Sequence, residues 1–191
     1  MVKKNTHLDI IKPSTKMKVN PNELSLLETE CLFGETVEIL NENLNWFYCK
    51  LLTDNYQGWI KKKSTGKLIR KSHRVIANRT FLLKDKHEKS NSINYLPMGA
   101  KVLVKSIQSN WAEIILPCSH NSSKSYIPSK HLVKLEHKVK DWVQIAENLV
   151  GTPYKWGGRD TVGIDCSALL QLSYLAYGEN LPRNTSEQSK I

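Results

Sequence analysis

The chain of 191 residues has the apolar content of an ordinary soluble protein and a formal net charge of +10 at pH 7. This length allows one large domain or two to three small ones. The lysine-rich start, residues 1–18, has no long apolar run, which excludes a secretory signal or membrane span there and predicts a cytoplasmic protein. Most of the excess positive charge lies in residues 69–136 without aromatic stacking motifs, so neither nucleic acid nor a membrane is expected as a partner.

The cysteines show no paired close spacing. They are Cys31, Cys49, Cys118 and Cys166. Scattered cysteines in a chain without a secretory signal favour reduced thiols over a disulfide framework. Because there is also no Cys-x-x-Cys or His-x-x-x-His pattern, the sequence predicts no metal site and no other cofactor.

An internal repeat covers most of the first 136 residues. Four residues recur exactly 65 positions later along the chain: Gly34, Val37, Ile39 and Trp46 become Gly99, Val102, Val104 and Trp111. Each copy consists of short alternating stretches separated by turn signals, which predicts β-strands. We therefore expect two small tandem β-barrels, residues 8–68 and 69–136, with Trp46 and Trp111 at equivalent places in their cores.

A glycine-rich stretch, residues 151–167, contains four of the nine glycines. The backbone is expected to take positive φ angles there, or to approach other groups closely. The residues from Cys166 to Tyr177 lack Gly and Pro. They predict a helix with Asp165 as the N-cap and Gly178 as the C′ residue.

Cys166 is a candidate nucleophile, because the dipole and free N–H groups of a helix N-terminus stabilise a thiolate. The alternative is a structural cysteine, since free cysteines are among the most buried residues. The polar neighbours Asp165 and Ser167, and the aromatic Tyr154 and Trp156 that can wall a pocket, favour a chemical role.

Three blocks of this region agree in order and spacing with a known family. They are Gly-Thr-Pro-Tyr-Lys-Trp-Gly-Gly from Gly151, Asp-Cys-Ser-Ala-Leu-Leu-Gln from Asp165, and Leu-Pro-Arg-Asn-Thr from Leu181. They resemble the NlpC/P60 family of bacterial cysteine peptidases, which cut peptidoglycan peptides, typically at the γ-D-glutamyl to diamino-acid bond. The resemblance implies a papain-like peptidase domain over residues 137–191, with Cys166 as the nucleophile and its backbone N–H helping to bind the oxyanion.

The same resemblance implies that Tyr154, Asp165 and Ser167 line the substrate pocket, where the acid holds a free peptide amine. Ala168 and Asn184 stand where the family usually has Gly and Asp. A larger departure concerns the catalytic His, which in this family follows the Cys by several tens of residues. All six histidines of this chain precede the cysteine. The chain is therefore expected to be truncated before its catalytic base and to be inactive in this form.

The first repeat resembles a bacterial SH3 domain of the kind that precedes the peptidase in dipeptidyl-peptidase relatives. Leu-Phe-Gly-Glu-Thr-Val-Glu-Ile-Leu from Leu32 and Tyr-Gln-Gly-Trp-Ile from Tyr56 carry this resemblance. In the second repeat, the sequence Ser-Tyr-Ile-Pro from Ser125 stands in the place of the Gly-Trp-Ile closing strand of the first repeat. The expected fold class is mainly β and then α+β: two tandem SH3-like β-barrels, followed by the N-terminal helical part of a papain-like NlpC/P60 lobe.

Two further helices are predicted beside the cysteine helix. Apolar residues at steps of three and four predict an amphipathic helix from Lys138 to Val150, whose apolar face includes Val143. Thr185 and Gln188 form a capping-box pattern for a third helix. Because no sheet follows the cysteine helix in this sequence, its apolar stripe is expected to face water.

Three functions remain open at this stage. The first is a cytoplasmic cysteine peptidase acting on short murein peptides, with the SH3-like barrels shaping the cleft. The second is a non-catalytic SH3-like module that binds a cell-wall peptide without cutting it. The third is the remnant of a split gene, and the oligomeric state is left open.

Overall fold

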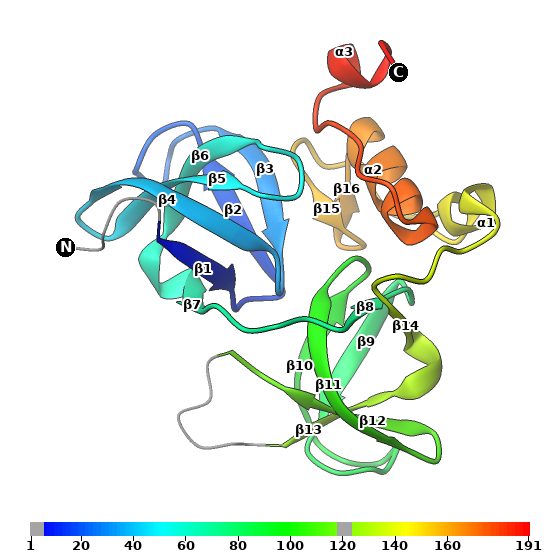
Figure 1. Cartoon of the computed structure of the whole chain (residues 1–191). Coiled ribbons are helices and arrows are strands. Elements are labelled where there is room, and N and C mark those ends of the chain that lie inside the picture. The colour runs from blue at the N-terminus through cyan, green and yellow to red at the C-terminus, as the bar shows by residue number, and fades with distance from the viewer. Residues whose placement is uncertain (1–5, 118–123) are drawn as a thin grey trace.

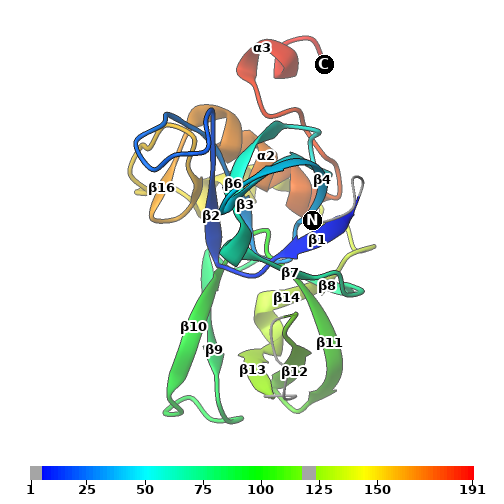
Figure 2. The same cartoon turned by 90° about the vertical axis from the view of Figure 1, so that its left-hand side faces the viewer.

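The computed structural model of the protein describes residues 6–117 and 124–191, so Cys118 and His120 lie outside the described residues. Within these residues, two seven-stranded antiparallel sheets precede a part that carries the helices (Figure 1). Figure 2 shows the two sheets one above the other. None of the helices in the described ranges is long and apolar enough to cross a membrane.

The first sheet, which we call the first repeat, encloses its own hydrophobic core. Ile10, Met17 and Ile60 are fully buried in it, on strands whose apolar and polar side chains point to opposite faces. A 3-10 turn, η1 (Lys62–Ser64), precedes its last strand. Across the sheet, the strands are β3 (Leu27–Leu32), β2 (Ser14–Lys18), β6 (Gln57–Lys61), β5 (Trp46–Leu51), β4 (Thr36–Asn43), β1 (His7–Ile10) and β7 (Thr65–Lys67).

The second sheet, the second repeat, has the same strand order when each strand is matched to the one seven places earlier. A 3-10 turn, η2 (Ser129–His131), again precedes the last strand. Its strands are β10 (Ser92–Pro97), β9 (Arg79–Leu83), β13 (Ser125–Pro128), β12 (Trp111–Ile115), β11 (Lys101–Gln108), β8 (His73–Val75) and β14 (Leu132–Lys134).

The strand register confirms the 65-residue repeat. Thr15 pairs with Cys31 between β2 and β3, and the residues 65 positions later pair in the same way between β9 and β10. Trp46 and Trp111 are the first residues of the equivalent strands β5 and β12, as predicted. Trp46 is buried, whereas Trp111 is half-buried, so the prediction that both lie in a core is wrong for Trp111. The repeat in the sequence is therefore a repeat in the structure.

The turn between β3 and β4 holds the two repeats together. Phe33 at its tip is buried in the core of the second repeat, and its carbonyl accepts a hydrogen bond from the Lys101 N–H at 2.9 Å. Gly34 beside it has a φ of +74°, and a Cβ there would lie 1.9 Å from the Lys101 carbonyl oxygen. A side chain at this position would push the two backbones apart.

The equivalent turn, between β10 and β11, contacts the helical part in the same manner. Met98 is buried in a cluster with Leu172. A Cβ on the adjacent Gly99 would lie 3.0 Å from Leu172 and 3.3 Å from Leu175. Each repeat thus uses the same turn to hold the unit that follows it in the chain.

The C-terminal part contains the cysteine helix and a two-stranded ribbon. The cysteine helix begins and ends where the sequence predicts, with Asp165 as the N-cap and Gly178 in the left-handed conformation at φ +95°. The elements of this part are α1 (Trp142–Glu147), β15 (Arg159–Asp160), β16 (Gly163–Ile164), α2 (Cys166–Tyr177) and α3 (Thr185–Gln188).

The first helix is shorter than predicted. The helix expected from Lys138 starts only after Asp141, whose carboxylate accepts hydrogen bonds from two N–H groups of the first turn. Val143, which is predicted to lie on the apolar face, is exposed, and so is Val150 at the end of the predicted helix. Ile145 is buried instead. A helix this short does not bury a stripe that runs over four turns.

The third helix is capped differently from the prediction. Its N-cap is Asn184, and no side chain makes a capping hydrogen bond, so the capping box of Thr185 and Gln188 is wrong. The Gln188 amide instead donates to the carbonyls of Ser167, at 3.1 Å, and Pro182, at 2.8 Å. This contact ties α3 to the start of α2.

The apolar stripe of α2 does not face water, contrary to the expectation from sequence. Ala168, Leu172 and Ala176 are buried against α1 and against Leu32 and Met98, which come from the two repeats. The β-repeats therefore supply the apolar cover of the cysteine helix.

Candidate active site

Cys166 is the first residue of α2, and its side chain is exposed. Among the described residues, no acceptor hydrogen-bonds to its backbone N–H, because the first turn of a helix has no intrahelical acceptors for its N–H groups. This free donor lies beside the thiol, where it can stabilise a negative charge.

Asp165 is buried and makes several hydrogen bonds. Its carboxylate accepts hydrogen bonds from Arg183 at 2.5 and 3.1 Å, from the N–H groups of Gly157 and Ala168 at 2.9 Å, and from the Ser167 hydroxyl at 3.2 Å. Burial alone would raise the pKa of Asp165, but Arg183 and the Ala168 N–H outweigh it and hold the pKa below its ordinary value. Contact of Asp165 and Ser167 with a substrate stays a prediction, since their polar atoms here bind Arg183.

Arg159 on β15 anchors the loop that leads to Cys166. This side chain is 1% exposed, and its two terminal nitrogens donate to the Glu35 carboxylate at 2.9 and 3.0 Å. Burial alone would raise the pKa of Glu35, but the guanidinium holds the pKa below its ordinary value. Because Glu35 belongs to the turn after β3, this bidentate pair fixes the loop to the first repeat.

Strand β3 of the first repeat runs along the same loop. The Glu30 carboxylate accepts hydrogen bonds from the Lys155 ammonium and from the Arg159 N–H. The Thr29 hydroxyl accepts a hydrogen bond from Arg183 at 2.6 Å. The first repeat therefore forms one wall of the site.

Glu28 and Tyr56 are candidate site residues that sequence reasoning missed. The Tyr56 hydroxyl donates to the Glu28 carboxylate, and burial followed by this hydrogen bond raises the pKa of Tyr56 to about 12. A Cβ on Gly157 would lie 3.2 Å from the Glu28 carbonyl oxygen, so the pair lies next to the loop. In the sequence, Tyr56 belongs to the strand motif that resembles a bacterial SH3 domain. No motif links Tyr56 or Glu28 to Cys166, because both lie in the first repeat, far from Cys166 in the chain.

The second repeat binds Asp160, the other residue of β15. Tyr95 donates to the Asp160 carboxylate at 2.9 Å, and Arg79 reaches Asp160 at 3.4 Å and the Thr161 hydroxyl at 3.0 Å. The Arg79 guanidinium also lies 4.5 Å from the centre of the Tyr95 ring, a cation–π contact. Strand β15 is thus fixed on one side by the first repeat and on the other by the second.

The other thiols that the structure describes are buried. Cys31 and Cys49 lie in the core of the first repeat. Burial raises the pKa of Cys31 well above its ordinary value and raises the pKa of Cys49 to about 12. Cys166 is therefore the exposed thiol among those described.

The histidines of the described ranges make no hydrogen bond with Cys166. The Nδ1 atom of His131 pairs with the Thr80 hydroxyl at 2.8 Å, and that of His73 with the Ser72 hydroxyl at 2.8 Å. Both pairs lie within the second repeat. The described residues thus place the exposed Cys166 thiol beside a free backbone N–H, and no described histidine is hydrogen-bonded to that thiol.

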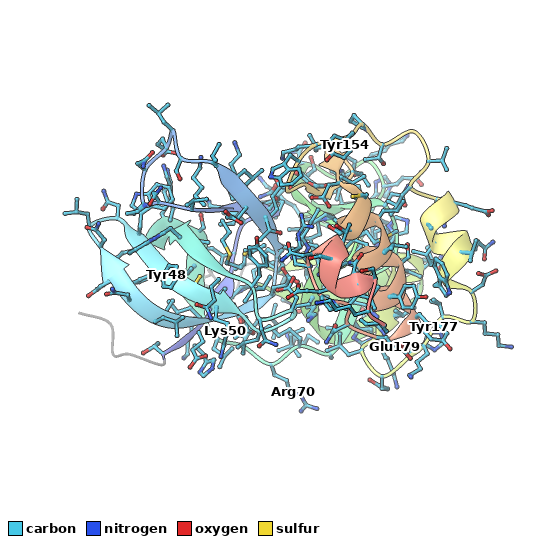
Figure 3. All side chains as sticks on the ribbon, turned by 90° about the horizontal axis from the view of Figure 1, so that it is seen from above. Tyr48, Lys50, Arg70, Tyr154, Tyr177 and Glu179 are labelled. Atoms are coloured by element: carbon cyan, nitrogen blue, oxygen red, sulfur yellow. The ribbon has the colours of Figure 1, made fainter. Side chains whose placement is uncertain are left out.

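Tyr154 and Trp156 are 67% and 70% exposed on the loop before α2. Figure 3 shows Tyr154 at the opposite end of α2 from Tyr177 and Glu179. The structure therefore places Asp165, Cys166 and Ser167 at the start of α2. The exposed side chains of Tyr154 and Trp156, on the loop before this helix, are accessible to a ligand.

Comparisons with known proteins agree with this architecture. Residues 19–64 match the bacterial dipeptidyl-peptidase Sh3 domain, and residues 151–191 match the NlpC/P60 family. The C-terminal part of the chain is therefore similar in sequence to a family of cysteine peptidases. The resemblance to the NlpC/P60 family stated from the three sequence blocks is confirmed.

Two curated relatives are similar over most of the chain. The gamma-D-glutamyl-L-lysine dipeptidyl-peptidase of Bacillus subtilis (strain 168) is 25% identical over 183 residues, which cover 87% of this chain and 58% of that protein. The dipeptidyl-peptidase 6 of Lysinibacillus sphaericus is 27% identical over 192 residues, covering 88% of this chain and 69% of that protein. The chain thus spans less than two thirds of the first relative.

Solved structures share the fold. An NlpC/P60 family protein from Bacillus cereus ATCC 10987 superposes with a TM-score of 0.83 over 97% of this chain and 77% of that chain, at 17% identity. An NlpC/P60 endopeptidase from Photobacterium damselae subsp. piscicida gives a TM-score of 0.70 over 96% of this chain and 45% of that one, at 15% identity. The fold of this chain is thus found in proteins described as members of the NlpC/P60 family.

Proposed function

We propose that the chain carries the nucleophile and much of the substrate-binding surface of a cysteine peptidase that hydrolyses γ-D-glutamyl peptides from peptidoglycan. The observation that carries the proposal is the exposed Cys166 thiol at the start of α2, beside a free backbone N–H, in a segment that matches the NlpC/P60 family. The name of the Bacillus subtilis relative, gamma-D-glutamyl-L-lysine dipeptidyl-peptidase, supplies the γ-D-glutamyl to diamino-acid bond. The resemblance to the NlpC/P60 family supplies the peptidoglycan peptides.

In this proposal the Cys166 thiolate attacks the carbonyl carbon of the scissile bond, and the Cys166 N–H stabilises the oxyanion that forms. The C–N bond then breaks, the leaving amine takes a proton from a general acid, and the acyl group stays on sulfur as a thioester. Water attacks the thioester and gives a proton to a general base, which releases the acid product and regenerates the thiol.

Substrate recognition in this proposal uses both sides of Gly157. Asp165 accepts a hydrogen bond from the Gly157 N–H, and the backbone carbonyl of Glu28 lies near the same glycine. A free peptide amine pairs with the Glu28 carboxylate, which here accepts a hydrogen bond from Tyr56, or with Asp165 in exchange for Arg183. Tyr154 and Ser167 complete the pocket, so a short peptide with a free N-terminus is the expected substrate.

The proposal also covers the roles of the three units. Residues 8–68 and 69–136 are taken as SH3-like barrels and residues 137–191 as peptidase domain. The match of residues 19–64 to the Sh3 domain and the shared strand order of the two repeats support this division. The barrels position the loop before Cys166 through Glu35 and its partner Arg159.

We propose that the 191-residue chain alone turns over slowly, because no described histidine bonds to Cys166. General-base assistance contributes about 10²- to 10⁴-fold to such reactions. The test uses L-Ala-γ-D-Glu-L-Lys as substrate. Slow release of L-Ala-γ-D-Glu is expected, accelerated by added imidazole and abolished by Cys166→Ala.

Calorimetric binding of the tripeptide to Cys166→Ala is the matched control, because that variant keeps the pocket. Release that persists in Cys166→Ala, or equal cleavage of the α-linked peptide, would contradict the proposal. A non-catalytic peptide-binding module is the second candidate, favoured by the thiol without an imidazole. Tight tripeptide binding with no imidazole-dependent turnover would establish it.

A further inference from the structure

A pair of adjoining hollows lies in the first repeat, outside the site at Cys166. The larger has a volume of about 680 Å³ and the smaller about 270 Å³, and they share Glu23, Trp46 and Lys61. Their lining carries more lysines than carboxylates, although Lys61 forms an ion pair with Glu23 and Lys62 forms one with Glu42. The lysines that line one or both are Lys16, Lys18, Lys61, Lys62 and Lys63. Such a concentration of positive charge raises the local concentration of anions.

The smaller hollow is lined by Lys18, a buried residue whose ammonium group has no carboxylate partner among the described residues. Lys18 is 7% exposed, and its Nζ donates to the carbonyls of Glu23 at 2.8 Å and Ser25 at 2.7 Å. An ammonium has three donors, so one remains for a ligand. Since neutral carbonyls do not cancel its charge, a bound anion would stabilise it.

The same hollow contains a buried hydroxyl that has no partner. Thr15 is 5% exposed, and its Oγ1 atom hydrogen-bonds to nothing within the described part of the chain. In the second repeat the equivalent Thr80 bonds to His131 at 2.8 Å. Ser64 stands in the place of His131, so the first repeat has lost this partner. Buried polar atoms without partners are uncommon and indicate a ligand or water.

The second repeat provides a comparison within the molecule. It has a hollow of about 380 Å³ at Trp111, lined also by Glu88 and Asn110 at the places of Glu23 and Asn45. The lysines differ, however. At the places of Lys16, Lys18, Lys61 and Lys62 the second repeat has Phe81, Leu83, Pro128 and Ser129. The hollow is thus common to both repeats, and the first has the larger positive charge, since Lys130 is the one lysine among the described residues that line the second.

We propose that the hollow at Trp46 binds an anionic glycan. The carboxylate or phosphate of the sugar pairs with Lys18 and Lys63. Its hydroxyls bond to Thr15 and Asn45, and its ring packs against the Trp46 indole, which lines both hollows. This site is separate from Cys166, so it holds a glycan independently of peptide cleavage.

The test measures binding of trigalacturonate to the whole chain by calorimetry and by the shift of the Trp46 indole N–H in NMR spectra. Maltotriose is the neutral probe of equal length, and tripolyphosphate carries charge without a ring. The wild-type chain should bind trigalacturonate and not maltotriose. The double variant Lys16→Ala/Lys63→Ala removes two exposed charges and should weaken binding about tenfold.

Two more variants make the result specific. Thr15→Val removes a hydroxyl that has no protein partner, so it should keep thermal stability and weaken trigalacturonate binding several-fold. Lys130→Ala changes the lysine equivalent to Lys63 in the second repeat and should leave binding unchanged. Equal weakening by Lys130→Ala, or no shift of the Trp46 signal, would overturn the site. Equal binding of tripolyphosphate would overturn its assignment to a sugar.

Discussion

The first and second repeats have the same strand order, but equivalent residues on them make different contacts. The turn after β3 carries Phe33 into the second repeat, whereas the turn after β10 carries Met98 against α2. Two positions further along these turns, the repeats differ again. Glu35 of the first repeat binds Arg159, whereas its equivalent in the second repeat is the uncharged Ala100.

The repeats also contact opposite charges of the same strand. The first repeat presents carboxylates and binds the cation Arg159, whereas the second presents Arg79 and Tyr95 and binds the anion Asp160. Only the first of these ion pairs is fully buried. The two repeats can therefore bind the same strand, β15, because the first repeat offers carboxylates to Arg159 and the second offers Arg79 and Tyr95 to Asp160.

The largest expected effect comes from breaking the buried pair. Arg159→Met leaves Glu35 buried without its partner and should lower the free energy of unfolding by about 3 to 5 kcal/mol. Arg79→Met, the matched change on the side of the second repeat, removes a more exposed pair and should cost about 1 kcal/mol or less. Urea denaturation measures both. The double variant Glu35→Leu/Arg159→Met should recover much of the loss, and equal losses for the two single variants would contradict the comparison.

The second effect concerns thiol reactivity. Cys31 and Cys49 stand where the second repeat has Leu96 and Ile114, so they replace aliphatic core residues. We expect a limiting alkylating reagent to modify Cys166 at least about 100-fold faster than either, because buried thiols react only after local opening. Peptide mapping in a Cys118→Ser background measures the rates. Comparable rates in the folded chain would show that the first repeat opens easily.

The third effect compares the two turn glycines. A Cβ at Gly34 would meet the Lys101 carbonyl of the backbone, whereas a Cβ at Gly99 would meet the flexible ends of leucine side chains. Both glycines have positive φ. Gly99→Ala should therefore cost about 1 kcal/mol, and Gly34→Ala about 2 to 4 kcal/mol, since the contact between repeats must also move. Thermal unfolding measures the difference, and a larger loss for Gly99→Ala would refute this reading of the turns.

The smallest effect is a dependence of stability on pH. The pKa values of Glu35 and Asp165 are lower in the folded chain than their ordinary values of 4.5 and 3.8. Their stabilisation is therefore complete above those values and is lost as the pH falls through the lower folded pKa values. Melting temperatures between about pH 6 and about pH 3 should fall less steeply in Glu35→Gln than in the wild-type chain. Identical slopes would show that Glu35 does not contribute.

The sequence by itself was sufficient for the cysteine helix with its two caps and for the repeat. The cysteine helix, its N-cap Asp165 and its left-handed Gly178 follow from residues within a few positions of each other, so local hydrogen bonding and sterics determine them. The 65-residue spacing likewise placed Trp46 and Trp111 on equivalent strands. The apolar pattern predicted the length of α1 wrongly, because the Asp141 carboxylate caps the first turn and the helix starts only at Trp142.

Only the tertiary structure decided what surrounds the cysteine helix. Leu32 and Met98 cover its apolar stripe, Arg159 finds Glu35 across the repeat boundary, and Glu28 with Tyr56 joins the wall of the site. These contacts join residues far apart in the chain, and no period or spacing encodes them. They form because burying apolar area and pairing buried charges lower the free energy only once the repeats and α2 have come together.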